Sequence, residues 1–479
     1  MQGYQCHKNM WLSVHRKELI PKVTPELQAL FDQGNKVTEE ARKRFPNGVL
    51  VDLPPWEFVA SLKKTRELLA AHTEFIFEAA FEYKGCYARA DVIAYNAVTQ
   101  RWSIIEVKST TKVKDEHLDD VGLQVWIMAN AGLPIEKISI LHLNNACKFP
   151  DMNNLFIEED VTDRLRDLHT RIAPRLNEIF SSLRIDEVPP QKFGAHCFAP
   201  RECQFIDLCR DEAALPEPNI FDIPGFYKKR WELFDRGLVS LDQVPEAALD
   251  EKQKIQVEVL KGKKRFVDRK KVSEHIASWK FPLIFLDFET INPAVPHFDG
   301  TSPFQQVPFQ FSVHILDSLE AKELRHIEFL QDDGTDPRSA LVPELLKACA
   351  GEGSVVAYYG VFEAKCIQDL EDYFPAQKQE LAQIRDRSVD PLPVFKDAVY
   401  DAAFKDSFSI KSVGPAILGE QFSYENMAVG DGSAAQRAYT ELAAMTPSPL
   451  RNQKRQALLD YCKKDTLIMV ELVKWLYQC

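Results

Sequence analysis

The sequence predicts an α/β fold, with a mixed sheet and flanking helices in an N-terminal domain and a second α/β arrangement in a C-terminal domain. Short runs rich in β-branched and aromatic residues alternate with helical patterns in both halves of the chain. The hydrophobic share of 45% is that of ordinary globular proteins, which excludes disordered, collagen-like and coiled-coil chains. The expected domains are residues 1–214 and 280–479, with residues 215–279 as a helical, basic linker region.

The N-terminal domain is expected to contain a mixed sheet between helices. Turn-prone residues, such as the pair Lys84-Gly85, separate the predicted strands. The pair Pro189-Pro190 ends the last long helical pattern. The predicted elements are strands at 75–83, 87–95, 102–109 and 137–144 and helices at 115–131 and 160–183.

A basic strip precedes the C-terminal domain. Residues 252–271 hold nine basic and two acidic residues, in a chain whose net charge is −12. A strip of this kind can follow a phosphate backbone, and a solvated helix face or linker explains it equally well. The residues predicted to bind nucleic acid are Lys263, Lys264, Arg265, Lys270 and Lys271.

The C-terminal domain opens with an apolar strand, "FPLIFLDFET", that ends in two carboxylates. Strands and helices then alternate, which is typical of an α/β domain. The further predicted elements are strands at 310–316, 325–330 and 355–359 and helices at 339–350, 363–373 and 453–476.

The first chemical constellation is Asp91, Glu106 and Lys108. Glu106 and Lys108 are two residues apart on one predicted strand, so they project from the same side, and an adjacent antiparallel strand can bring Asp91 beside them. Two carboxylates can hold Mg²⁺. The lysine can orient or deprotonate a water, or stabilise the charge that develops on a phosphate. The pattern is short and also occurs in half-exposed hairpins, but a charged Glu-Val-Lys at the end of an apolar strand is poorly explained by core packing.

Residues 30–145 resemble the PD-(D/E)XK nucleases of the RecB type. The resemblance implies that Asp91, Glu106 and Lys108 occupy catalytic positions and that Gln124 belongs to the helical glutamine motif. Many relatives have a metal-binding histidine shortly after a glycine on the first helix. This chain has Gly34 but no histidine between residues 15 and 72, so Glu39 or Glu40 is the candidate replacement.

Four of the ten cysteines form a pattern. Cys197, Cys203 and Cys209 are separated by five residues each, and Cys6 lies near the N-terminus. Three independent buried cysteines within so short a loop are a weak explanation, and the spacing is not that of structural zinc knuckles. A cluster held by four thiolates tolerates wide and varied spacing.

This arrangement resembles that of iron–sulfur nucleases, namely the CRISPR-adaptation exonucleases and the AddB-type helicase–nucleases. The resemblance implies a [4Fe–4S] cluster on these four residues. The other cysteines have no partner pattern and are expected to be ordinary thiols: Cys86, Cys147, Cys349, Cys366, Cys462 and Cys479.

The second chemical constellation combines two strand-borne and two helix-borne residues. Asp287 and Glu289 end the apolar strand, and Tyr461 and Asp465 are four residues apart on one helix face. Glu363 opens a helix between them. Four carboxylates can bind two divalent cations that contact the attacking and leaving oxygens of a phosphodiester. Each pair alone is a common surface pattern.

"FLDFET … YCKKDT" resembles the DEDD exonucleases of the RNase H-like fold, tyrosine subtype, over residues 280–476. The resemblance implies metal carboxylates at Asp287, Glu289 and Asp465 and a water-positioning tyrosine at Tyr461. The middle motif departs from the family, which usually has aspartate in place of Glu363 and asparagine in place of Tyr359 or Gly360. Asp397 and Asp401 are candidate auxiliary acids.

Together the two halves resemble a bacterial family of fused nucleases. The expected function is metal-dependent phosphodiester hydrolysis at two sites, with Mg²⁺ or Mn²⁺ and no covalent intermediate. DNA is expected rather than RNA, because relatives of the first domain cut DNA. A non-catalytic nucleic-acid-binding or partner-binding protein with degenerate sites and an RNA-processing exonuclease are the alternatives. The sequence has no run of about 18 apolar residues, so no membrane span is predicted. A cytoplasmic location is expected.

Overall fold

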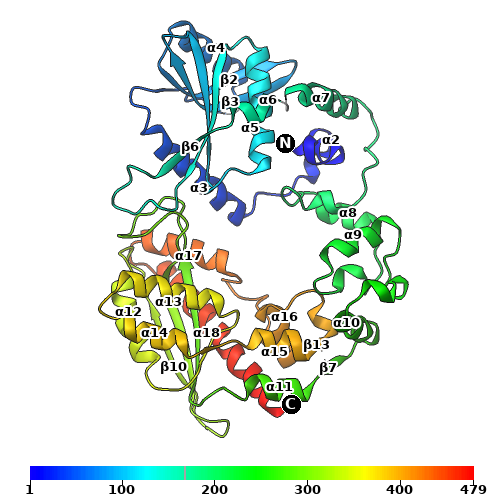
Figure 1. Ribbon diagram of the computed structural model, residues 1–479, viewed down its shortest axis with the longest axis vertical. Helices are drawn as coiled ribbons and strands as arrows, with labels where there is room; N and C mark the ends of the chain where they lie inside the picture. The colour runs from blue at the N-terminus through cyan, green and yellow to red at the C-terminus, as the bar shows by residue number, and fades with distance from the viewer. Residues whose placement is uncertain (55, 167–168) are drawn as a thin grey trace. The chain divides into compact units, whose positions relative to one another are not determined.

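The structure, a computed structural model, describes residues 1–54, 56–166 and 169–479. Unit 1 consists of Met1–Ala214 with Pro293–Gln305, and unit 2 consists of Leu215–Asn292 with Gln306–Cys479. Each unit contains a mixed sheet with flanking helices, so the predicted α/β class is confirmed (Figure 1). No helix among the described residues is long and apolar enough to cross a membrane.

Unit 1 is built on a six-stranded sheet in the order β1-β2-β3-β4-β5-β6. The pairs β1–β2 and β4–β5 are parallel, and the other neighbouring pairs are antiparallel. The strands are β1 (Val49–Leu50), β2 (Phe75–Tyr83), β3 (Cys86–Asn96), β4 (Arg101–Lys108), β5 (Ile135–Leu143) and β6 (Phe156–Asp160).

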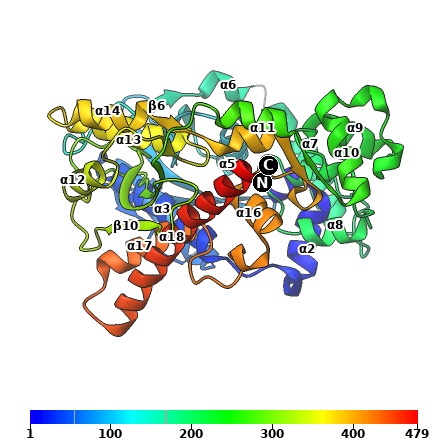
Figure 2. The same ribbon diagram turned by 90° about the horizontal axis from the view of Figure 1, so that it is seen from below.

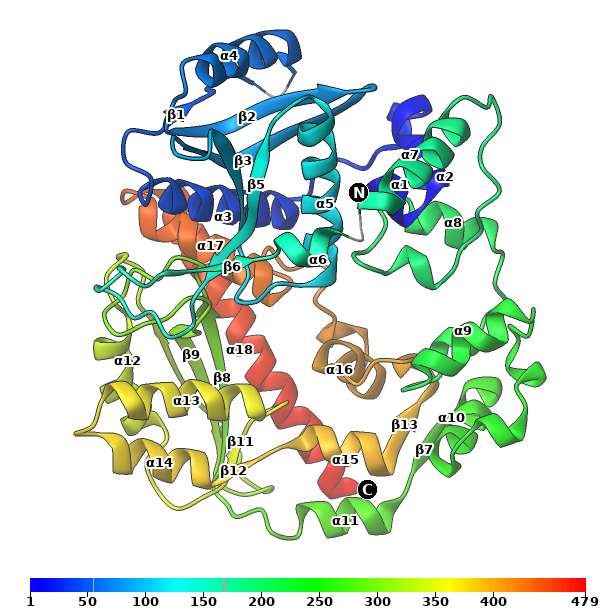
Figure 3. The same cartoon turned by 45° about the horizontal axis from the view of Figure 1, so that its top comes forward.

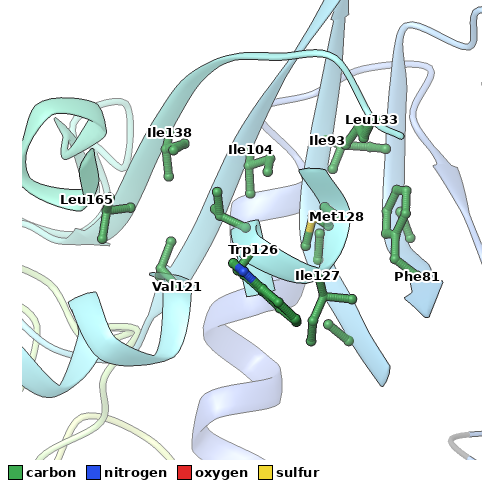
Figure 4. Close-up of a cluster of buried hydrophobic side chains, with 14 of the residues drawn as sticks. Phe81, Ile93, Ile104, Val121, Trp126, Ile127, Met128, Leu133, Ile138 and Leu165 are labelled. Carbon is green, nitrogen blue, oxygen red and sulfur yellow. The ribbon is translucent and has the colours of Figure 1, made fainter. Parts of the chain in front are cut away.

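Helices cover both faces of this sheet (Figure 3). On one face, Val121, Trp126 and Met128 of α5 pack against Ile104 and Ile138 of the strands (Figure 4). On the other face, α3 contributes its buried residues to a second apolar cluster. The helices of unit 1 are α1 (Gln2–Gln5), α2 (His7–His15), α3 (Pro25–Arg42), α4 (Phe58–Ala70), α5 (Asp115–Asn130), α6 (Thr162–Arg166), α7 (His169–Leu183) and α8 (Ile206–Glu212).

In strands β2 and β3, the regular alternation of side chains between the two faces of the sheet is interrupted beside Asp91. Ile76 and Ala79 of β2 belong to the same apolar cluster although three positions separate them, and Glu78 between them has a left-handed φ of 57°. In β3, Ala90 and Ile93 likewise share a cluster across Asp91. A regular strand would place such pairs on opposite faces, so both strands change face beside Asp91.

Unit 2 is built on a five-stranded sheet in the order β10-β9-β8-β11-β12, and β7 and β13 form a separate pair. β8 is antiparallel to β9 and parallel to β11, and it is the central strand. The strands are β7 (Arg265–Val267), β8 (Leu283–Ile291), β9 (Val307–Leu316), β10 (Arg325–Leu330), β11 (Val355–Val356), β12 (Ser388–Val389) and β13 (Val399–Asp401).

The two faces of this sheet have different partners. Ile284, Leu286 and Phe288 of β8 pack with the buried residues of α12, α13 and α14. The alternate residues of β8 therefore face the long helix α18, which also contacts β9 and lies beside α17 (Figure 2). The helices of unit 2 are α9 (Tyr227–Asp235), α10 (Glu251–Gly262), α11 (Arg269–Ile276), α12 (Arg338–Ala348), α13 (Val361–Tyr373), α14 (Lys378–Asp386), α15 (Pro391–Ala398), α16 (Ile410–Leu418), α17 (Gly432–Ala444) and α18 (Pro449–Gln478).

The structure differs from the sequence-based expectation in three places. The helix expected over 160–183 is described as α6 and α7, and its residues 167–168 lie outside the described residues. Residues 215–279 belong to unit 2, because α10 and β7 contact β13. Residues 293–305, expected in the C-terminal domain, belong to unit 1, where Thr301 O accepts a hydrogen bond from Phe149 N at 3.0 Å.

Candidate active sites

In unit 1, Asp91 and Glu106 meet because β3 and β4 are antiparallel neighbours. Their pairing ends at Val92 opposite Ile105, and Asp91 and Glu106 are the residues next to this last pair on the two strands. Asp91 Oδ2 accepts a hydrogen bond from the backbone N–H of Val107 at 2.7 Å. Glu106 is buried and Asp91 is half-buried.

Lys108 and Gln124 both contact Glu106. Lys108 Nζ donates to Glu106 Oε1 at 2.8 Å, and Gln124 Nε2 donates to the same oxygen at 3.0 Å. Lys108 Nζ also donates to Asp120 Oδ2 at 2.7 Å. The structure thus brings together the four residues that the sequence singled out in this half of the chain.

Burial and charge set the protonation of this group. Burial, and then the charge of Glu106, raise the pKa of Asp91 well above its ordinary value. Burial raises the pKa of Glu106, although Lys108 acts against it. Burial lowers the pKa of Lys108, but Glu106 and Asp120 raise it by more, so the ammonium keeps its proton at neutral pH.

The donor set fits a hard divalent cation. Glu106 Oε2 and Gln124 Oε1 are buried and accept no hydrogen bond from any residue that the structure describes. A buried carboxylate oxygen without a partner is costly, and a cation that takes oxygen ligands removes that cost. Asp91 and Glu106 are the residues of this chain that would hold Mg²⁺ or Mn²⁺ here.

Two acids near this group were not predicted. Asp120 precedes Gln124 by four residues on α5, so the helical spacing was a usable signal for it. Glu78 lies on β2, contributes to the raised pKa of Asp91, and pairs with Arg42 at 2.7 Å. Its left-handed backbone on a strand carries no sequence signal.

The candidate replacements for the missing histidine lie apart from this group. Glu40 binds Lys43 with both carboxylate oxygens at 2.7 Å. Glu39 is exposed on α3. Helix α3 packs on the sheet face opposite α5, whose Gln124 contacts Glu106. Within the described residues, neither Glu39 nor Glu40 contacts the Asp91 and Glu106 carboxylates.

The four patterned cysteines gather around the N-terminal segment. Cys6 lies between α1 and α2, while Cys197 ends the short 3₁₀ helix η2 (Ala195–Cys197) and Cys209 lies in α8. Cys6 contributes to the raised pKa of Cys203 and of Cys197, after burial. Burial raises the pKa of Cys209 to about 11, and Cys197 and Cys203 add to that effect. Cys197 and Cys203 are therefore within electrostatic range of both Cys6 and Cys209.

Polar contacts hold this arrangement in place. Gln5 Nε2 donates to the carbonyl oxygens of His196 at 2.9 Å and Arg201 at 2.7 Å. Asn9 Nδ2 donates to Cys203 Sγ at 3.3 Å. Lys8 is buried beside Cys209 and pairs with Glu212. A buried cation and an N–H donor directed at sulfur suit a group of thiolates.

The separation of the cysteine sulfurs bears on the kind of metal site that they could form. Zinc–sulfur bonds of about 2.3 Å in a tetrahedron place the sulfurs about 3.8 Å apart. Among the described residues, no three cysteine sulfurs lie within 4.8 Å of one another. Thiolates that bind the separate irons of a cluster lie farther apart than those around one zinc ion, and Cys6, Cys197, Cys203 and Cys209 are the residues of this chain that would hold a [4Fe–4S] cluster.

In unit 2, Asp287 and Glu289 lie at the end of the central strand and face α18. β11 pairs with β8 only at Ile284 and Phe285, so the later part of β8 is free on that side. A register shift in the β8–β9 ladder follows directly after Glu289. Bulges of this kind redirect side chains at functional sites.

Asp465 and Glu363 complete the group of carboxylates. Asp465 is buried on α18, and Glu363 is buried in the first turn of α13. The charges of both act on Asp287 and on Glu289. Glu363 Oε2 accepts no hydrogen bond from any described residue. One strand, β8, and two helices, α13 and α18, thus place four predicted carboxylates in one group.

These carboxylates share a low-dielectric site without a paired cation. Burial, and then the charge of Asp465, raise the pKa values of Asp287 and Glu289 well above their ordinary values. Burial raises the pKa of Asp465 to about 6 and that of Glu363 to about 8. Within the part of the chain that the structure describes, none of the four forms a salt bridge, so divalent cations fit this donor set.

Two tyrosines and a lysine surround Asp465. Tyr424 donates its hydroxyl hydrogen to Asp465 Oδ1, and the Tyr461 hydroxyl lowers the pKa of the same carboxyl by hydrogen bonding. Burial and then Asp465 raise the pKa of Tyr461, so its hydroxyl stays protonated and can donate. Lys411 Nζ lies 5.3 Å from the ring centre of each tyrosine. Tyr424 and the role of Lys411 were missed, because their distance from Asp465 along the chain gives no periodic signal.

The turn before Glu363 is held by Asp390. Its carboxylate accepts hydrogen bonds from the backbone N–H groups of Tyr359 and Gly360 at 3.1 Å each. Tyr359 itself is exposed and has a left-handed φ of 63°. The backbone of these two residues therefore shapes the start of α13, and the exposed Tyr359 side chain does not join the carboxylate group.

The two candidate auxiliary acids are engaged elsewhere. Asp397 pairs with Lys252 at 2.8 Å, and Asp401 pairs with Arg265 at 2.7 Å. An aspartate held by a basic side chain is already charge-compensated. The structure does not bring Asp397 or Asp401 to the carboxylate group.

Cys462 belongs to the second site, contrary to the expectation of an ordinary thiol. Among the described residues, Asp287, Glu289 and Cys462 are the only group of three or more His, Cys, Asp or Glu residues whose ligand atoms lie within 4.8 Å of one another. The position directly after Tyr461 on the same helix was the available signal.

The basic strip is divided among three elements. Lys263 follows α10, Arg265 lies in β7, and Lys270 and Lys271 lie in α11. Arg265 is bound by Asp401, Lys270 lies 3.8 Å from Glu274, and Lys271 lies 3.9 Å from Asp268. Lys264 and Lys263 are exposed and form no salt bridge within the described residues. The strip is therefore partly neutralised and is not one continuous helix face.

Comparison with known proteins gives one family match. Residues 284–409 match a family described as a domain of unknown function (DUF2779). The match covers about a quarter of the chain and includes Asp287, Glu289 and Glu363, while Asp465 lies beyond it. No curated protein matches the chain.

Proposed function

We propose that this protein is a metal-dependent nuclease with two phosphodiesterase sites, one in each unit. The observation that carries the proposal is that each unit groups buried carboxylates around a sheet strand, and that one oxygen in each group, on Glu106 and on Glu363, has no hydrogen-bond partner among the described residues. Bound Mg²⁺ or Mn²⁺ would supply an activated water and offset the charge of a phosphodiester. The resemblance of both halves to nuclease families supports the same function.

In the first site, Asp91 and Glu106 hold the cation and Lys108 acts as a charged donor. Lys108 is fixed between Glu106 and Asp120, so its ammonium is positioned before substrate arrives. Because its pKa is raised, Lys108 is suited to stabilising negative charge on the phosphate and unsuited to accepting a proton from water.

In the second site, Asp287, Glu289, Glu363 and Asp465 hold cations, and Tyr461 orients the attacking water. The protonated Tyr461 hydroxyl can donate one hydrogen bond and accept another. Tyr424 positions Asp465 through its hydrogen bond to Oδ1. A 3′→5′ exonuclease activity is proposed for this site on the strength of the resemblance alone.

A [4Fe–4S] cluster on Cys6, Cys197, Cys203 and Cys209 completes the proposal as a structural element. The cluster would join the N-terminal segment around Cys6 to residues 197–209, which lie near the end of the Met1–Ala214 part of unit 1. Thiols kept available for metal are typical of a reducing compartment, which supports a cytoplasmic location. DNA is the proposed substrate. Lys263 and Lys264, which are exposed and form no salt bridge within the described residues, are the proposed phosphate contacts.

The test is cleavage of end-labelled single- and double-stranded DNA and RNA in Mn²⁺ by the full-length protein and its Lys108→Ala and Asp287→Ala variants. We expect each variant to lose a different activity by about 100-fold or more and the double variant to be inert. Lys112→Ala, which removes a lysine from the loop after β4, is the matched control for Lys108→Ala and keeps full activity.

Three results would contradict the proposal. Absence of cleavage by the wild-type protein would favour the non-catalytic alternative. Exclusive cleavage of RNA would favour the RNA-processing alternative. Loss of every activity in either single variant would show that the two sites do not act independently.

A further inference from the structure

Cys462 differs from the other buried cysteines of unit 2 in what surrounds it. Cys349 and Cys366 belong to the apolar cluster under α12, α13 and α14. Cys462 is completely buried on α18, and its Sγ lies 3.3 Å from Asp287 Oδ2.

The sulfur and two carboxylates are close enough to bind one ion. The ligand atoms of Asp287, Glu289 and Cys462 lie within 4.8 Å of one another. A second observation also indicates a bound cation near these residues. Glu363 is only 5% exposed, its Oε2 has no hydrogen-bond donor among the described residues, and its charge acts on both Asp287 and Glu289. A cation bound by Asp287, Glu289 and Cys462 would offset the negative charge of these carboxylates and of the nearby Glu363.

We propose that Asp287, Glu289 and Cys462 form a binding site for a divalent cation that accepts sulfur ligands, namely Zn²⁺. Mg²⁺ takes oxygen ligands, whereas Zn²⁺ binds thiolate and carboxylate together. When the sulfur binds, a metal–sulfur bond forms and the thiol proton passes to solvent. The thiolate therefore adds to the affinity for Zn²⁺ and leaves that for Mg²⁺ unchanged.

This inference deepens the proposed function, because it concerns regulation of the second site by the identity of the bound metal. Zn²⁺ held by Cys462 competes with Mg²⁺ for Asp287 and Glu289. The inference is tested by metal binding and not by cleavage, so its failure and the failure of the proposed nuclease activity are distinguishable.

The experiment compares Zn²⁺ and Mg²⁺ affinities of the full-length protein, purified without oxygen, with those of the Cys462→Ser variant. We expect Cys462→Ser to weaken Zn²⁺ binding by about tenfold or more and to leave Mg²⁺ binding nearly unchanged. Cys349→Ser, which changes a buried thiol in the apolar cluster, is the matched control and keeps the Zn²⁺ affinity.

X-ray absorption at the zinc edge provides a readout that does not depend on a variant. With one Zn²⁺ per chain added to the protein, we expect a sulfur shell at about 2.3 Å in addition to oxygen ligands. Glu289→Gln keeps the thiol and is expected to lower the affinities for both ions. A zinc spectrum without the sulfur shell, or equal losses of Zn²⁺ and Mg²⁺ affinity in Cys462→Ser, would overturn the proposal.

Discussion

Two glutamates on α13 show how partners decide the effect of a buried charge. Glu363 and Glu371 are both buried. Glu371 pairs with Arg385 at 2.7 Å, whereas Glu363 has no basic partner within the described residues. Burial raises the pKa of Glu363 to about 8 from an ordinary value of 4.5. The folded, metal-free protein therefore binds a proton at Glu363 that the unfolded chain releases.

The pH dependence of stability follows from that difference. Because the folded-state pKa is the higher one, Glu363 costs stability progressively as pH rises from 4.5 to about 8. Removing this charge should help the metal-free protein. We expect Glu363→Gln to raise the free energy of unfolding at pH 8 by on the order of 1 kcal/mol, measured by denaturant unfolding with a chelator present.

Glu371→Gln provides the opposite expectation on the same helix. It leaves Arg385 without its buried partner and should lower stability by roughly 1–3 kcal/mol. Added Mg²⁺ should raise the free energy of unfolding of the wild-type protein by more than it raises that of the Glu363→Gln variant. Equal effects of the two substitutions in chelator would show that Glu363 is charge-compensated in the fold.

At the scale of elements, sequence patterns identified some long strands and helices but missed the long helices α3, α4 and α17 as well as the short strands. Strand β2 occurs at the predicted residues, because its β-branched and aromatic run is bounded by turn residues. Strands β1, β11 and β12 have two residues each, too few for a period. Asp287 and Glu289 could be placed on one side of a strand, since spacing of two decides it.

The partners of those residues depend on tertiary packing. Asp91 reaches Glu106 where β3 changes face, which an alternating pattern does not predict. Tyr424 reaches Asp465 from a loop. The sequence therefore predicted the carboxylates themselves, while their positioning residues required the structure.

The N-terminal helices give an element-scale prediction through Cys6. Cys6 and Cys209 are 203 residues apart, so a cluster that binds both closes a long loop. Cys6→Ser should lose iron and sulfide and lower the stability of unit 1 by roughly 2–5 kcal/mol. Anaerobic metal analysis and hydrogen exchange of residues 1–214 measure the two effects.

Cys86→Ser is the control, since Cys86 is the first residue of β3 and lies outside the cysteine pattern. It should retain the cluster. Stoichiometric zinc without iron in the wild-type protein would contradict the cluster, and normal exchange in Cys6→Ser would contradict its structural role.

At the scale of the whole molecule, the chain passes between the two units three times. Residues 293–305 leave unit 2 between β8 and β9 and pack into unit 1, where Ala294 joins an apolar cluster. Gly300 N donates to Phe149 O at 2.8 Å. If the chain is cut between residues 214 and 215, residues 293–305 therefore still connect the second fragment to unit 1.

We expect fragments 1–214 and 215–479, expressed together, to purify as a complex, because the second fragment carries residues 293–305. The measurement is co-purification through a tag on one fragment. Replacing residues 293–305 by a Gly/Ser segment of equal length should abolish the complex. Persistence of the complex after that replacement would show that other contacts hold the fragments together.

The same segment links the stability of β8 to the folding of unit 1. The connection between Ile291 and Val307 is pinned while unit 1 is folded and becomes a free loop when it unfolds, and closing a free loop costs entropy. A ligand that stabilises unit 1 thus also stabilises the strand that bears Asp287. Because such coupling is reciprocal, a cation bound at Asp287 protects unit 1 against unfolding by the same free energy.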